Sequence, residues 1–125
     1  MPINEEAKHF AEHVVDLLQN IGPVYSKRMF GGFGVFLDGL MFGLIADNEL
    51  YLKVDDHNRS DFEELGLGPF TYNKNGKLMN LSYYQAPEEA MESLELMSRW
   101  GANAYECALR AAASKKRTKA PRQKR

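Results

Sequence analysis

The chain has 125 residues, 44% of them hydrophobic and 11% aromatic, and a formal net charge of −1 at pH 7. A chain of this length folds as about one domain around a single core, and the composition is too apolar for general disorder. The acidic start, MPINEEAKHF, lacks the features of a signal peptide, and no run of about 18 apolar residues is present, so we expect a cytoplasmic protein without a membrane span.

The charge is unevenly divided along the chain. The end of the sequence, KKRTKAPRQKR, holds seven of the 16 Lys and Arg and no acid, which leaves nine basic and 17 acidic residues, a net charge of −8, in residues 1–114. We therefore predict one domain over residues 1–114, followed by a basic, disordered tail over residues 115–125. The single cysteine, Cys107, excludes an internal disulfide.

The first half of the chain predicts a helix followed by strands. Apolar residues recur at helical spacing over residues 4–23, with Asn4 as the cap and Gly22-Pro23 as the stop. After an extended segment, alternating apolar residues lead to Asp38-Gly39, a hairpin signal. The next run, residues 40–46, is apolar without alternation, which indicates a central strand covered on both faces.

The middle of the chain predicts more strands and a short helix. Leu50, Leu52 and Val54 alternate with polar positions, as in a half-buried strand. Residues 58–66 predict a short helix, and residues 70–84 predict a second hairpin around Asn75-Gly76.

The end of the domain predicts two helices. The first begins at Pro87 and passes through Met91, Met97 and Trp100, which we expect in the core; Gly101 should divide it from a second helix over residues 102–114. The fold class is therefore α+β, a mainly antiparallel sheet of five to six strands with an amino-terminal helix, a short middle helix and two carboxy-terminal helices.

The stretch 28-RMFGGFGVFLDG-39 is the most unusual local composition. A dinucleotide-binding loop needs the spacing G-x-G-x-x-G between a strand and a helix, but here a strand should follow. A phosphate-binding P-loop is excluded because no Gly-Lys-Ser/Thr closes the run. We interpret Gly31, Gly32 and Gly34 as structural: they allow positive φ, a bulge or close packing.

Other groups of reactive side chains also favour structural roles. His9, His13 and Asp16 share a helical face, but they leave a metal shell incomplete and Phe10 stands where H-E-x-x-H chemistry needs a glutamate. The run 55-DDHNRSD-61 is typical of helix caps and first-turn acids. We predict no catalytic residue, no metal and no cofactor, and we expect Cys107 to be a small buried residue.

The basic tail has a plain electrostatic interpretation. Its cations can contact phosphates without reading bases, so we predict weak, non-specific nucleic-acid binding, while a purely solubilising role stays open. The candidate residues are Lys115, Lys116, Arg117, Lys119, Arg122, Lys124 and Arg125.

Several segments in succession carry a family resemblance: 28-RMFGGFGVFLDG-39, 42-FGLIADNELYLKVDDHNRSDFEELG-66, 69-PFTY-72 and 82-SYYQAPEEAMES-93. Together they resemble the amino-terminal domain of the TfoX/Sxy family of bacterial competence regulators, over roughly residues 9–114. The resemblance implies a secretion-chaperone-like α+β arrangement, a cytoplasmic bacterial protein and a link to transcription regulation. Longer members of that family carry a second, helical domain, for which residues 115–125 offer no counterpart. The resemblance supplies no catalytic residues.

We therefore expect a non-enzymatic regulatory module that acts through protein contacts, with a transcription regulator as the expected partner. Arg28, Gly31 and Gly32 are the candidate partner-binding residues. The alternative is a small-molecule-binding protein or small enzyme with a pocket between sheet and helices. A homodimer stays open.

Overall fold

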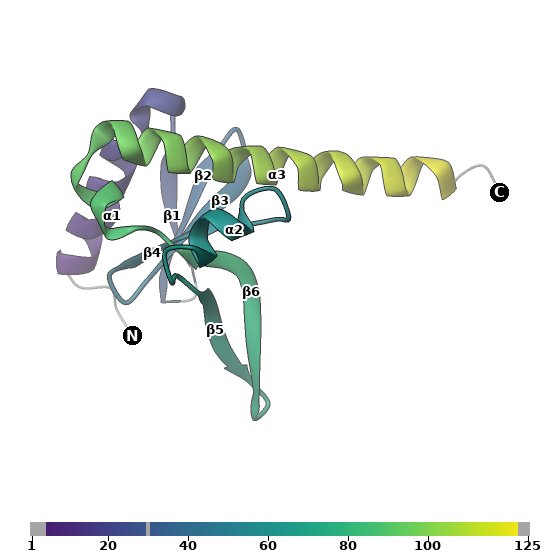
Figure 1. The fold of residues 1–125 in the computed structure, drawn as a ribbon, viewed down its shortest axis with the longest axis horizontal. Helices are drawn as coiled ribbons and strands as arrows, with labels where there is room; N and C mark the ends of the chain where they lie inside the picture. The colour runs from purple at the N-terminus through teal and green to yellow at the C-terminus, as the bar shows by residue number, and fades with distance from the viewer. Residues whose placement is uncertain (1–4, 30, 123–125) are drawn as a thin grey trace.

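The computed structural model describes residues 5–29 and 31–122, with side chains described as far as Lys115. It confirms the α+β class: one six-stranded antiparallel sheet with helices before, within and after it (Figure 1). The strands are β1 (Tyr25–Met29), β2 (Gly32–Leu37), β3 (Leu40–Ala46), β4 (Glu49–Lys53), β5 (Pro69–Lys74) and β6 (Lys77–Gln85). The α-helices are α1 (Glu5–Leu17), α2 (Arg59–Glu63) and α3 (Leu94–Arg122), and the 3-10 helices are η1 (Gln19–Ile21) and η2 (Glu88–Glu92).

The sheet follows chain order except at its last step. Its strand order is β1-β2-β3-β4-β6-β5, so the apolar strand β3 lies inside the sheet, as predicted. The predicted turns at Asp38-Gly39 and Asn75-Gly76 both have positive φ at each residue, the conformation of tight two-residue hairpins. Asp47 and Asn48 close a third turn in the same way. The turn residues thus fix the order of neighbouring strands.

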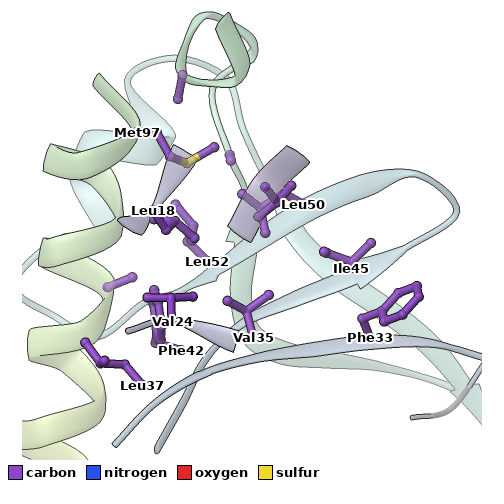
Figure 2. Close-up of a cluster of buried hydrophobic side chains, with 14 of the residues drawn as sticks. Leu18, Val24, Phe33, Val35, Leu37, Phe42, Ile45, Leu50, Leu52 and Met97 are labelled. Atoms are coloured by element: carbon purple, nitrogen blue, oxygen red, sulfur yellow. The ribbon is translucent and has the colours of Figure 1, made fainter. Parts of the chain in front are cut away.

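One face of the sheet carries the core. Alternate residues of β2 and β4, among them Val35 and Leu52, are buried with Val14 of α1 and Met97 of α3. Figure 2 shows Leu18 between Met97 and the sheet residue Leu52. The helices α1 and α3 therefore cover this face, and α3 lies across the strands and continues past the body of the protein (Figure 1).

The prediction that Gly101 separates two helices is wrong. Residues 94–122 form one α-helix, and Gly101 lies buried within it. A Cβ at Gly101 would collide with the side chain of Leu18, so the glycine lets α3 approach the end of α1 closely. A helical glycine costs about 1 kcal/mol relative to alanine. Here its small size serves the packing of two helices.

The break in the carboxy-terminal helical region occurs earlier, at Ser93. Ser93 has an extended backbone between η2 and α3, and its Oγ accepts a hydrogen bond from the Leu96 amide at 3.1 Å. This is the geometry of an N-cap, which satisfies an otherwise unpaired amide in the first turn. Ser93, rather than Gly101, therefore sets the boundary between η2 and α3.

Two predictions, one near each end of the chain, are not tested by the described residues. Asn4, the expected cap of the first helix, lies outside the described residues. The backbone of α3 is helical through the predicted boundary at residue 114 to Arg122, but no side chain beyond Lys115 is described, so the disordered tail stays a prediction. Among the described residues, no helix is long and apolar enough to cross a membrane.

Candidate interaction surface

The predicted partner-binding residues lie around the turn between β1 and β2. Arg28 is exposed on the edge strand β1, and Gly31 is exposed with a φ of 76°. Gly32 is buried at the start of β2. Arg28 and Gly31 are thus both exposed near this turn, whereas Gly32 is buried and is not available to a partner.

Gly32 and Gly34 have packing roles. A Cβ on Gly32 would collide with the carbonyl oxygen of Ile45 in β3. Over Gly34, the space of a side chain is filled by Met29, Phe36 and Met41. Glycine in a strand commonly marks such a close approach. The glycine-rich stretch therefore shapes a turn and two strands, as predicted.

The face of the sheet opposite the core carries rings and lysines. Cross-strand pairs place side chains on a common face: Tyr25 opposite Phe36, Leu44 opposite Tyr51, and Lys53 opposite Tyr83. The described helices α1 and α3 pack on the other face. We call this surface the open face and define it by Tyr25, Lys27, Phe36, Tyr51, Lys53, Phe70 and Tyr83.

The rings of the open face contact one another in pairs. Tyr25 and Phe36 are stacked, with centroids 5.6 Å apart and ring planes 12° apart. Tyr51 and Phe70 meet edge to face at 5.1 Å, which joins β4 to the edge strand β5. Each geometry is a favoured one for aromatic pairs. The rings are therefore held in place before any partner binds.

Both lysines of the open face lie over rings. Lys27 Nζ is 4.9 Å from the centroid of Phe36, and Lys53 Nζ is 5.0 Å from that of Tyr83. Tyr83 donates a hydrogen bond to the carbonyl oxygen of Met41 at 3.3 Å, and burial raises the pKa of its hydroxyl to about 12. Tyr83 is thus neutral at physiological pH and fixed in place, and its ring makes a cation–π contact with Lys53.

The run 55–61 supplies the predicted first-turn acid of α2, Asp61, but not the predicted side-chain cap. Asn58 occupies the cap position of α2 without a side-chain cap bond. Asp55 instead accepts two hydrogen bonds from Arg110 of α3, at 2.7 and 3.0 Å. This contact holds the pKa of the Asp55 carboxyl well below its usual range. Because Asp55 and Arg110 lie far apart in the sequence, no local pattern reveals the pair.

Cys107 lies beneath this ion pair and is buried, as predicted. Burial raises the pKa of its thiol to about 11. The nucleophilic form of cysteine is the thiolate, which this environment disfavours. The group of Asp55, Arg110 and Cys107 therefore joins the loop after β4 to α3 and lacks an activated nucleophile.

The helical histidines also have structural contacts. His9 lies 3.8 Å from Glu5, and His13 donates a hydrogen bond to the carbonyl oxygen of Met91 at 2.9 Å. Within residues 5–29 and 31–122, no group of three or more His, Cys, Asp or Glu is placed to hold a metal ion. His13 also borders a cleft of about 580 Å³ between α1 and η2, together with Glu88 and Glu92.

Sequence reasoning missed the open face, although part of its signal is present. Tyr25, Lys27 and Met29 alternate in β1 as Glu49, Tyr51 and Lys53 do in β4. Both patterns indicate one face with rings and charges. Only the position of the helices shows that the face is left uncovered, and that position is not encoded locally.

The sequence matches the family described as the TfoX N-terminal domain over residues 16–108. It is 30% identical over 83 residues to the DNA transformation protein TfoX1 of Aliivibrio fischeri, covering 66% of this chain and 40% of that protein. It is 26% identical over 73 residues to Protein Sxy of Escherichia coli, covering 58% of this chain and 35% of that protein. The match thus spans less than half the length of either relative. The chain belongs to the TfoX N-terminal domain family.

Proposed function

We propose that this protein is a non-enzymatic regulatory module that acts through protein contacts in competence-type control of transcription. The names of its relatives, a DNA transformation protein and Sxy, support the competence link. The observation that carries a contact role is the open face, an ordered set of rings and lysines on the side of the sheet away from α1 and α3. Aromatic side chains are enriched in protein interfaces, which favours this surface as the contact site.

A contact role is also supported by the state of the ionisable groups. Asp55, Cys107 and Arg110 line a cleft of about 590 Å³ together with His57, but in it Asp55 is ion-paired with Arg110 and the Cys107 thiol is buried with a raised pKa. An enzyme needs free, activated groups in its substrate cleft rather than paired or buried ones. The space between the sheet and the helices is occupied by core side chains, among them Leu52 and Met97. These observations favour binding over catalysis.

The proposal is tested by gene deletion and complementation in the native host. Transcripts are compared between the wild-type strain, a deletion strain, and deletion strains that express either the wild-type protein or a Tyr25→Ala variant. We expect deletion to alter transcripts for DNA uptake, and we expect only the wild-type protein to restore them. Tyr25 is 41% exposed, so its removal should leave the core intact.

A matched control uses Leu109→Ala on α3, because Leu109 is 46% exposed and lies away from the open face. This variant should restore transcription as the wild-type protein does. Transcript levels that are unchanged by deletion would contradict the proposed function. A thermal-shift screen with metabolites and nucleotides tests the alternative of a small-molecule binder, since a bound ligand raises the melting temperature.

A further inference from the structure

The charges of this protein are divided unevenly between its strands and its other segments. The six strands together carry five cationic side chains and one carboxylate, Glu49, a net charge of +4. The remaining positions of residues 1–114 carry four cationic and 16 acidic side chains, a net charge of −12. The strands are therefore positive within an acidic domain, while the turns that join them carry Asp38 and Asp47. Such a field attracts an anionic partner to the strands and repels it from the rest of the domain.

Most of the strand cations belong to the open side of the sheet. Lys27 lies opposite Gly34, and Lys53 lies opposite Tyr83, so register places both there. Side-chain alternation along β6 from Tyr83 carries Lys77 to the same side, and Lys77 pairs directly with Lys74 of β5. Like charges directly opposite each other in a sheet are destabilising. A bound anion would relieve this repulsion.

The one carboxylate of the strands is at the border of this surface. Glu49 begins β4 and accepts a hydrogen bond from Gln85 at 2.9 Å. Of the rings on this surface, Tyr51 lies near Glu49 and Asp47, whose charges, after burial, raise the pKa of its hydroxyl. The surface therefore alternates rings with cations from β1 to the β5–β6 hairpin, which projects from the body (Figure 1).

Single-stranded nucleic acid has the chemistry that complements this surface. Its phosphates pair with lysines, and its unpaired bases stack on aromatic rings. In a duplex the faces of the bases are stacked on one another and are not open to rings on a flat sheet. Tyr25, 41% exposed and stacked on Phe36, offers a ring for a base.

From this arrangement we infer that the open face, with the Lys74–Lys77 pair, binds single-stranded DNA or RNA, with bases against the rings and phosphates at the lysines. This activity goes beyond the proposed protein contacts, but it uses the surface that they are assigned, so the two partners would exclude each other there. It is also separate from the predicted binding by the basic tail, which offers charges without rings. The same surface could hold a protein, and the test below distinguishes the two classes of partner.

The test measures fluorescence anisotropy of a labelled single-stranded oligothymidylate and of a duplex of equal length, at several salt concentrations. The full-length chain is used with the seven tail cations, Lys115 to Arg125, changed to glutamine. The variants are Tyr25→Ala and the double change Lys27→Gln and Lys53→Gln. The matched control is Arg99→Gln on the exposed surface of α3, which removes one cation outside the sheet. Circular dichroism confirms that each variant is folded.

We expect the tail-neutral protein to bind the single strand more tightly than the duplex. Tyr25→Ala should weaken single-strand binding about 10-fold, the loss of one stacked base. The double lysine change should reduce the slope of log affinity against log salt by about 1.4, since each phosphate contact on a single strand contributes about 0.7. Arg99→Gln should change the affinity less than twofold, within the weak effect of a distant, screened charge.

Several results would overturn the inference. One is the absence of single-strand binding by the tail-neutral protein, which would show that the wild-type chain binds through its tail alone. Another is equal weakening by Arg99→Gln and by the double lysine change, which would indicate general electrostatics. If the open-face variants lose a purified protein partner but keep the oligonucleotide, the surface is a protein-binding site and the inference is wrong.

Discussion

Replacing Gly32 with alanine tests whether the glycine-rich stretch is structural. The new Cβ would meet the carbonyl oxygen of Ile45, and real Cβ atoms essentially never come closer than 3.0 Å to such an atom. The obstacle is backbone in the neighbouring strand, so a side-chain rotation cannot relieve it. Strands β2 and β3 must separate where Phe33 pairs with Ile45. Overpacking typically costs about 1–3 kcal/mol, and we expect the upper end, about 3 kcal/mol.

Gly31→Ala is the matched comparison. Gly31 has a φ of 76° and nothing within 4 Å of a Cβ, so alanine there incurs only the left-handed backbone cost of about 1–2 kcal/mol. Gly31→Asn should cost less, because asparagine tolerates this conformation.

The assay is thermal unfolding followed by circular dichroism. About 3 kcal/mol corresponds to a fall in Tm of roughly 10 °C or more for a domain of this size, against roughly 5 °C for Gly31→Ala. A Gly32→Ala variant that melts with the wild-type protein, or above Gly31→Ala, would refute the packing argument.

Three further predictions concern the ion pair, the thiol and the tail. Asp55 has a lowered pKa in the folded state, so the stability it contributes is present above its ordinary pKa of 3.8 and is lost as pH falls below that value. Arg110→Gln should therefore lower the free energy of unfolding at pH 7 by about 1 kcal/mol, a modest value because the pair is partly exposed. It should also make the free energy of unfolding depend less on pH in the acid range. Wild-type and variant proteins that lose stability equally as the pH falls would argue against this prediction. Cys107 should resist alkylation at pH 8 until the protein unfolds, because burial raises its pKa to about 11; rapid labelling of folded protein would contradict this. Neutralising the tail cations should abolish weak duplex binding in a gel shift at low salt, and binding that persists unchanged would exclude the tail.

The sequence predicted the elements whose signals are local. Asp38-Gly39 and Asn75-Gly76 mark tight turns through their backbone preferences, and the alternation of Leu50, Leu52 and Val54 indicates a half-buried strand. Gly101 misled because a helical glycine is both a common stop and a point of close packing, and only contact with Leu18 distinguishes the two. The turn and strand signals are sufficient by themselves, whereas the meaning of Gly101 depends on its contact with Leu18.

The candidate surface was less accessible to sequence reasoning. Arg28 was found because it precedes the glycines, yet the rings that form the open face come from β1, β2, β4, β5 and β6. Their convergence depends on strand order, and their exposure depends on which face α1 and α3 cover. Both are tertiary properties, so a single sequence indicates the residues but not the surface.

Site-specific photo-crosslinking in the native host tests most directly whether the open face binds a partner. A photoreactive amino acid is placed either at Tyr25 on the open face or at Leu109 on α3, two positions with similar exposure, 41% and 46%. We predict covalent adducts with a cellular partner from position 25 and none above background from position 109. Adducts from position 109 with none from position 25 would contradict the assignment of the open face.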